Sequence, residues 1–405
     1  MRFVVKGWLL SVVLLPLLSA ACATTNRPLS ASGKPISPEA ISNAVRTVEE
    51  QQIPESIRQP FVAMYAEGRE NQALYAMRAG LAAMYIGDFP LAARTLDMAT
   101  ADVDSLMAGE KEAQRASGKF VKEQEKWFKG ENYERSALFF FRGLLYLATN
   151  DFGNAAACFK RAQLYDITGD DAPGFAGDWY SCEWTLAFAA YKQGFPEEAK
   201  QAMERAAKFS TRQGDVPPPE PNQNVLVVVL TGGGPIKTRA GKYGERLVYV
   251  EGPNPVTEVE IREGSRVLAR SAAAESLYVQ ASTRGTRQVD YLLAGKANFK
   301  QGTAVAAAAL GAGAVIASQQ HNGGTAAGIL AGLALVSALV SSATTPEADI
   351  RTWNNLPHSI FLIGLTLPPG EQKLEVRGIG PYPHTMEATP VVRAGDPLQI
   401  VFVRM

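Results

Sequence analysis

The sequence predicts an α+β protein in which a helical half precedes a β-rich half. Alanine-rich segments with helical periodicity fill residues 37–210, a proline-rich linker covers residues 211–224, and short apolar or alternating segments between Pro and Gly turns occupy residues 225–405. A charge-free Ala/Gly-rich run at residues 303–343 interrupts the second half. The 405 residues include 40 basic and 40 acidic side chains, a balance that excludes a disordered tail and a dedicated nucleic-acid binder.

The amino terminus has the three-part plan of an export signal. Two basic residues precede an uncharged run, which ends in small residues directly before Cys22. The run is too short for an ordinary spanning helix. Residues 1–21 are therefore predicted to be a cleaved signal peptide, and residues 22–36, which are polar and loop-like, a flexible tether.

The small residues before Cys22 resemble the lipobox of bacterial lipoproteins. In that family the cysteine is acylated and becomes the new first residue, so the resemblance implies a lipid anchor at Cys22. Ala23 after the cysteine implies the outer membrane by the family's rule, and the protein is expected to face the periplasm. Ser19 departs from the leucine that many lipoboxes carry, and an ordinary secretory signal is the alternative.

Three segments of the helical half share one pattern. Each has a small residue seven positions before a Gly or Asn at a turn: Gly80 and Gly87, Gly143 and Asn150, Ala187 and Gly194. Two helices can cross closely only where one side chain is small, and the turn needs a residue that tolerates positive φ. We therefore expect three helical hairpins.

The pattern resembles the tetratricopeptide repeat over roughly residues 70–210. The resemblance implies stacked hairpins whose concave face docks a peptide or protein segment. The spacing between copies is longer than the family's, and the first interval leaves room for an additional helix at residues 108–130. We expect an irregular solenoid or bundle, and a purely structural helical domain is the alternative.

Two local features follow from the helical half. Cys158 and Cys182 fall on helices expected to be neighbours, where an exported compartment permits a disulfide, although free, half-buried thiols are favoured. Residues 217–222 contain four prolines, and this stiff segment is expected to hold the two halves apart.

Short strands around Pro/Gly turns predict a small β-sandwich-like domain in the second half. The predicted strands are residues 225–230, 246–251, 257–261, 360–367, 373–376 and 398–403.

The apolar run is expected to form a helical hairpin from residues 303–318 and 324–343. Gly324, Gly328 and Gly332 are four residues apart and are predicted to make one helix-packing face. One interpretation is a glycine zipper inserted in a membrane, through which copies of the chain associate. Burial against the sheet or within the hairpin is favoured, because only the second helix reaches the length of the hydrocarbon core.

Residues 348–357 and the 367–371 turn resemble a poorly characterised family of bacterial lipoproteins that joins a tetratricopeptide-like half to a β-rich half. The resemblance implies an architecture and a compartment but no reaction. Within it, Asp349 and Arg351 are predicted either to form an ion pair near Trp353 or only to lead the chain into a strand.

The sequence contains few signs of chemistry. Residues 232–237 lack the spacing of a phosphate loop, and a plain loop is expected there. His321, His358 and His384 have no metal-ligand spacing, and no nucleophile elbow is present. We therefore expect no catalytic residue, no metal and no cofactor.

These features favour a non-catalytic, lipid-anchored adaptor or assembly scaffold that binds an envelope protein or peptide segment. The alternative is a membrane-integrated assembly or pore-type protein that uses the hairpin at residues 303–343. An envelope hydrolase is the remote alternative, since folding alone can assemble a carboxylate pair.

Overall fold

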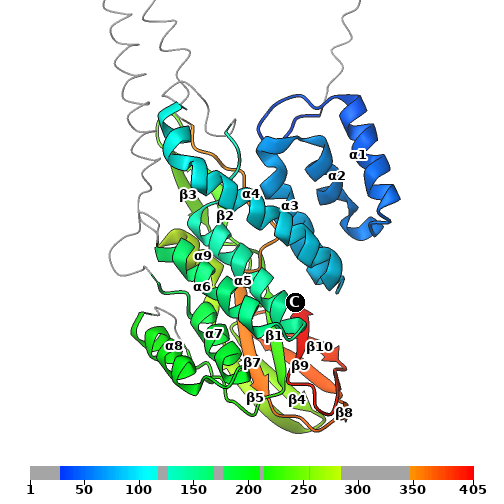
Figure 1. The fold of residues 1–405 in the computed structure, drawn as a ribbon, viewed down its shortest axis with the longest axis vertical. Coiled ribbons are helices and arrows are strands. Elements are labelled where there is room, and N and C mark those ends of the chain that lie inside the picture. The colour runs from blue at the N-terminus through cyan, green and yellow to red at the C-terminus, as the bar shows by residue number, and fades with distance from the viewer. Residues whose placement is uncertain (1–27, 117–125, 168–176, 210–213, 255, 284–346) are drawn as a thin grey trace, which may run out of the picture.

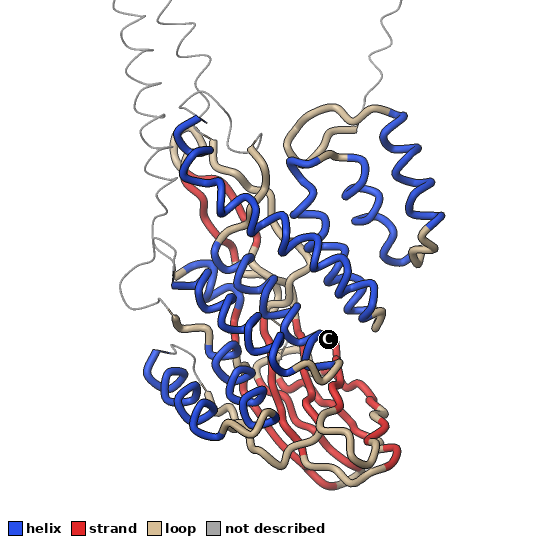
Figure 2. Tube along the Cα trace, in the orientation of Figure 1, coloured by secondary structure: helices blue, strands red, loops and turns tan. Residues whose placement is uncertain are grey.

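A computed structural model describes residues 28–116, 126–167, 177–209, 214–254, 256–283 and 347–405 (Figure 1). The predicted signal peptide, Cys22 and the hairpin with Gly324, Gly328 and Gly332 lie outside these residues. The α+β prediction is confirmed, because the described helices concentrate in the first half and the sheets in the second (Figure 2).

Eight α-helices precede the first strand of the described chain. They are α1 (Pro38–Glu50), α2 (Arg58–Ala66), α3 (Arg69–Tyr85), α4 (Phe89–Ala116), α5 (Asn132–Ala148), α6 (Phe152–Ile167), α7 (Tyr180–Lys192) and α8 (Pro196–Phe209). A short 3₁₀ turn at Glu55–Ile57 links α1 to α2. Ser37 caps α1, where its side chain accepts a hydrogen bond from the amide of Ala40.

The three predicted hairpins are α3–α4, α5–α6 and α7–α8, and the expected close approaches are confirmed. A Cβ built on Gly80 would lie 2.5 Å from Leu96, and one on Gly143 would lie 2.5 Å from Phe159. The three predicted turn residues all have positive φ, which is 80° at Gly87, 59° at Asn150 and 78° at Gly194. Local steric rules therefore determine these helix pairs.

Residues 117–125 of the additional helix expected at residues 108–130 lie outside the described residues, and the described parts of that range do not form a separate helix. Residues 108–116 continue α4, and the described residues from 126 to 131 are not helical. The amide of Phe128 donates a hydrogen bond to the carbonyl of Glu70, 2.7 Å away, and Gly130 has φ of 76°. The hydrogen bond attaches this segment to the first turn of α3.

The second half contains two four-stranded sheets. In the first, β1 (Val225–Thr231) lies between β12 (Gln399–Arg404), which runs parallel to it, and β7 (Ser359–Leu365), which is antiparallel, and β6 (Glu275–Ser276) pairs with β7. The second has the order β10 (His384–Ala388), β9 (Leu374–Ile379), β4 (Glu258–Glu263), β5 (Arg266–Ala272).

Three shorter elements complete the described chain. One hairpin pairs β2 (Ile236–Ala240) with β3 (Arg246–Val250), and a separate two-stranded antiparallel sheet pairs β8 (Gly370–Glu371) with β11 (Val391–Val392). Helix α9 (Leu277–Ser282) follows β6.

Strand β1 is buried on both faces, which explains its uninterrupted apolar sequence. Val225, Val227 and Val229 belong to a core shared with β4 and β9 of the second sheet. Leu226, Val228 and Leu230 belong to the core that contains the helices. The first sheet therefore has the helices on one face and the second sheet on the other.

The two halves are not held apart, so the expectation from the proline-rich linker was wrong. One apolar cluster includes residues from both halves. The linker itself packs on α7, because the indole Nε1 of Trp184 donates to the carbonyl of Pro217 at 2.8 Å. The stiffness of the linker does not separate the halves because β1 begins directly after it with an apolar face to cover.

The first helix of each hairpin contacts the β-rich half through its side chains, and Phe89 at the start of α4 also packs on β12. Residues Tyr133–Leu145 of α5 and Tyr180–Ala190 of α7 are all buried. In the second helices, by contrast, many side chains reach solvent, and α8 buries only Ala199, Ala202 and Ala206. The chain's own sheet therefore covers the inner side of the helical layer.

Candidate functional site: the polar seam between helices and sheets

The segment at residues 347–356 runs between α3, α5 and the β2–β3 hairpin, and it includes the residues predicted to form an ion pair. We call this region, with the side chains that contact it, the polar seam. It joins the two halves of the protein through hydrogen bonds and buried charges.

Arg351 and Asp349 form the predicted ion pair, in which Nη2 lies 2.7 Å from Oδ2. The guanidinium also donates to the side chain of Asn71 at 2.9 Å and to the carbonyls of Glu70 and Lys126. Its side chain is only 3% exposed. Arg351 therefore ties the returning chain to the start of α3, a role beyond that of a local strand start.

A second ion pair in the seam joins the helical half directly to the β-rich half. Lys237 Nζ on β2 lies 2.6 Å from Glu134 Oε2 on α5, and the two side chains are 1% and 0% exposed. Glu134 is the third residue of α5 and accepts the amide of Glu131 in a capping box. The positive end of the helix dipole stabilises a carboxylate at this position.

The same two residues hold the main chain of the seam. The second oxygen of Glu134 accepts the amide of Trp353 at 2.8 Å, and Lys237 donates to the carbonyl of Arg351 at 2.9 Å. Three elements that are distant in sequence thus converge on one buried pair.

Helix α3 makes a further set of bonds to the seam. Arg78 Nε donates to the carbonyl of Thr352 at 3.1 Å, and Tyr85 donates to the carbonyl of Asn355 at 2.8 Å. Burial lowers the pKa of Arg78 and raises the pKa of Tyr85. These shifts come from desolvation in a packed interface.

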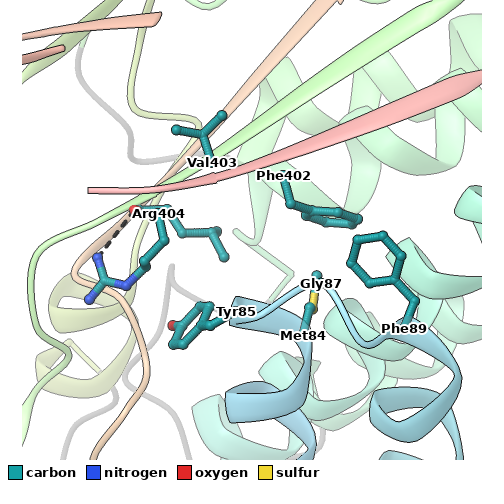
Figure 3. Close-up of a pocket in the computed structure, with 8 residues that line it drawn as sticks. Met84, Tyr85, Gly87, Phe89, Phe402, Val403 and Arg404 are labelled. Carbon is teal, nitrogen blue, oxygen red and sulfur yellow. Dashed lines mark hydrogen bonds between the residues drawn. The ribbon is translucent and has the colours of Figure 1, made fainter. Parts of the chain in front are cut away.

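A small pocket of about 70 Å³ lies beside the seam, where the α3–α4 turn meets β12 (Figure 3). The rings of Phe89 and Phe402 face each other there with centroids 5.1 Å apart. Arg404 Nη1 donates to the carbonyl of Leu230. A volume of this size suits a few water molecules and not an organic substrate.

A second buried polar cluster joins α7 to β6 and α9. Glu275 accepts hydrogen bonds from the amide and the hydroxyl of Ser181 and from Gln280 Nε2. Burial, and then the nearby carboxylate of Asp178, raise the pKa of Glu275 to about 8. The carboxyl is therefore mostly protonated at neutral pH and acts as a structural tie.

One arrangement resembles a catalytic relay. His358 Nδ1 lies 2.8 Å from Ser359 Oγ, and His358 Nε2 lies 2.9 Å from Glu251 Oε1. A nucleophilic serine must face its substrate, but Ser359 is 2% exposed on a strand paired on both sides. The arrangement thus fastens β7 to the end of β3.

The remaining sequence-predicted residues are not brought together. His384 lies on exposed β10, and His321 falls outside the described residues. Cys158 and Cys182 are free thiols, as favoured, although Cys182 is fully buried. Among the described residues, no group of three His, Cys, Asp or Glu side chains has a geometry suited to a metal ion.

The sequence patterns did not single out Lys237 and Glu134 as site residues. Residues 232–237 were expected to be a plain loop, yet β2 begins at Ile236. The alternation Ile-Lys-Thr-Arg-Ala was an available strand signal. Glu131 and Glu134, three residues apart at the start of an apolar helical pattern, were an available capping signal.

Two general findings bear on the class of protein. In the part of the chain that the structure describes, no helix combines the length and the hydropathy needed to cross a bilayer. No family model, curated protein or solved structure matches this chain, so its function has to be inferred from its own residues.

Proposed function

We propose that the protein is a lipid-anchored, non-catalytic scaffold of the bacterial cell envelope, attached to the outer membrane through Cys22 and facing the periplasm. Its tetratricopeptide-like helical layer and its sandwich-like pair of sheets act as one body. The polar seam carries this proposal, because its buried charges bond one half of the chain to the other.

The helical layer is proposed to bind an envelope protein or peptide segment on its outer side. The expected concave docking face is the side that the chain's own sheet covers, since α3, α5 and α7 all contact the β-rich half. Large apolar side chains remain exposed on the second helices, and these are Met98, Leu164, Ile167 and Phe209. A partner would therefore meet α4, α6 and α8.

The lipid anchor is tested by two measurements on the protein made in bacterial cells. Mass spectrometry of the mature N-terminal peptide should find Cys22 acylated and residues 1–21 removed. The wild-type chain should stay with membranes in alkaline carbonate, and a Cys22→Ser chain should be released. An unmodified Cys22 overturns the anchor, and a Cys22→Ser chain that stays in the pellet favours membrane insertion of residues 303–343.

The binding face is tested with a photo-crosslinking amino acid placed at Leu164 on α6 or at Val267 on β5. Both side chains are 45% exposed, so the two positions are matched for accessibility. We expect a discrete crosslinked species in cells from Leu164 and none from Val267. The reverse pattern would move the partner to the sheets.

A further inference from the structure

The β2–β3 hairpin has an outer face that is apolar and exposed. The register pairs Ile236 with Val250 and Thr238 with Val248, which places all four side chains on one side. Ile236 is 53% exposed, Val250 49% and Val248 40%. A face that meets only water normally carries polar side chains.

The inner face of the same hairpin carries its charges. Lys237 points inward to Glu134, and Arg239 Nε donates to the carbonyl of Ala348 at 2.9 Å. The polarity of β2 is therefore inverted relative to a strand on a water-facing surface, with charged residues inside and apolar residues outside. A shift of the register by one residue would expose Lys237 to solvent and leave Glu134 buried without its cation. The register of the hairpin is therefore fixed.

The tip of the hairpin has the side chains typical of a lipid headgroup region. Lys242 and Arg246 are exposed, and the ammonium of Lys242 lies 5.5 Å from the ring centroid of Tyr243. Glu245 is used within the turn, where its carboxylate accepts the amide of Tyr243 at 2.9 Å. Lys, Arg and Tyr are the residues that favour the interface with anionic headgroups.

Residues 347 and 348, the first described residues after residue 283, contact this hairpin. Glu347 pairs with Arg239 at 3.1 Å, and the amide of Ala348 donates to the carbonyl of Gly244 at 2.8 Å. On the other side, residues 284–346 follow α9, which packs against β3. The described residues on either side of 284–346 therefore both lie close to this hairpin.

The N-terminal tether reaches the same end of the molecule. Lys34 pairs with the side chain of Glu70 at 2.6 Å, and Arg351 donates to the carbonyl of Glu70. Arg351 is three residues after Ala348, which is bonded to the β2–β3 hairpin, so about 10 Å of chain separates the hairpin contact from the contact with Glu70. Figure 1 shows β2 and β3 toward the end that carries α1, and β8 at the opposite end. Cys22 precedes residue 28 by six residues, a reach of about 20 Å.

We propose that the outer face of the β2–β3 hairpin, formed by Ile236, Val248 and Val250 with Lys242 and Tyr243 at its tip, contacts the surface of an anionic lipid bilayer. The inference rests on the lipid anchor proposed above and adds the orientation of the body on the membrane. The body then lies with the hairpin toward lipid and with β4, β5 and β8 away from it.

The test measures the depth of one side chain in lipid. The full-length acylated protein is reconstituted in vesicles of phosphatidylethanolamine and phosphatidylglycerol, and an environment-sensitive fluorophore is attached at Val248→Cys. The matched control is Val267→Cys on β5, a strand that Figure 1 shows toward the opposite end of the molecule, and Val267 is 45% exposed against 40% for Val248. Both variants carry Cys158→Ser, so that the half-buried native thiol is not labelled.

We expect nitroxide-labelled lipids to quench the fluorophore at position 248 and to leave the fluorophore at position 267 unquenched. Equal quenching at both positions, or quenching only at 267, in protein that floats with the vesicles would overturn the orientation and leave the anchor intact. Protein that does not float with vesicles disproves the anchor itself. A disulfide-linked dimer of the unlabelled Val248→Cys protein, together with no lipid quenching of the labelled protein, would assign the face to a second copy of the chain and overturn the bilayer contact.

Discussion

Lys237 Nζ on β2 lies 2.6 Å from Glu134 Oε2 on α5, and neither side chain is more than 1% exposed. The two residues are 103 positions apart in the chain. Two charges withdrawn from water need each other, because a buried charge without a partner costs far more than a surface charge. This pair therefore couples the folding of the helical half to that of the β-rich half.

Removing one member of this pair is expected to destabilise the protein strongly. Lys237→Met leaves Glu134 buried without its cation, and the free energy of unfolding should fall by about 3–5 kcal/mol. Urea unfolding followed by circular dichroism measures the change. Lys242→Met is the control, because Lys242 is exposed on the same hairpin and should change the free energy by less than about 0.5 kcal/mol.

The double variant Lys237→Met with Glu134→Gln tests whether the two charges act on each other. The double variant should lose less free energy of unfolding than the two single variants lose together, because it leaves no buried charge without a partner. Additive losses would show that the two charges stabilise the fold independently.

The close approach of α5 and α6 predicts an asymmetric effect of two Gly→Ala substitutions. In Gly143→Ala the new Cβ would lie 2.5 Å from Phe159 Cε1, so overpacking should cost about 1–3 kcal/mol. In Gly153→Ala the Cβ meets nothing within 4 Å, and the change should be neutral or stabilise α6 by up to about 1 kcal/mol. Thermal unfolding of both variants provides the comparison, and equal midpoints would contradict the packing.

The raised pKa of Glu275 predicts that part of the free energy of unfolding decreases as pH rises. Its pKa in the folded protein is about 8, above the usual 4.5, so the folded state binds more protons than the unfolded state between these values. The free energy of unfolding should therefore fall across this window by up to about 1.4 kcal/mol per pH unit from this group. The nearby Asp166 and Asp178 add repulsion when Glu275 ionises.

The variant Glu275→Gln isolates that component. Its carbonyl oxygen can still accept from Ser181, and the amide has no proton to lose. As pH rises from 5 to 8, the free energy of unfolding of the variant should increase relative to that of the wild type. Urea titrations at steps of about one pH unit across that range measure the difference. A constant difference would show that Glu275 ionises normally.

The two described thiols should differ in reactivity. Burial raises the pKa of Cys158 to about 11, and burial also raises the pKa of Cys182 well above its ordinary value. A disulfide reagent at neutral pH should react slowly with Cys158, which is partly exposed, and with Cys182 only after unfolding. Peptide mapping after timed labelling assigns each rate, and rapid labelling of Cys182 would contradict its burial.

Features set by near neighbours in the chain could be predicted from the sequence. Asn150 at the α5–α6 turn and Gly143 in the crossing follow from the need for positive φ and a small side chain. Asp349 and Arg351 are two residues apart, so their pairing needed no knowledge of the fold.

Features that depend on distant contacts could not be predicted. The partner of Lys237 lies on another half of the chain, and a single unaligned sequence does not reveal such a pairing. The same holds for the linker, because the stiffness of its prolines is local, whereas the packing of β1 on the helices is not. The seam at residues 347–356 was found only as an ion pair, without its contacts to α3 and α5.

The sheet that covers α3, α5 and α7 also limits how such a chain can evolve. A helical layer whose inner side is permanently occupied cannot be cut out at the proline-rich segment and transplanted as a recognition module, because both fragments would be left with bare apolar surfaces. The halves would have to be inherited, synthesised and degraded together, and the surfaces left free to diverge would include those of α4, α6 and α8.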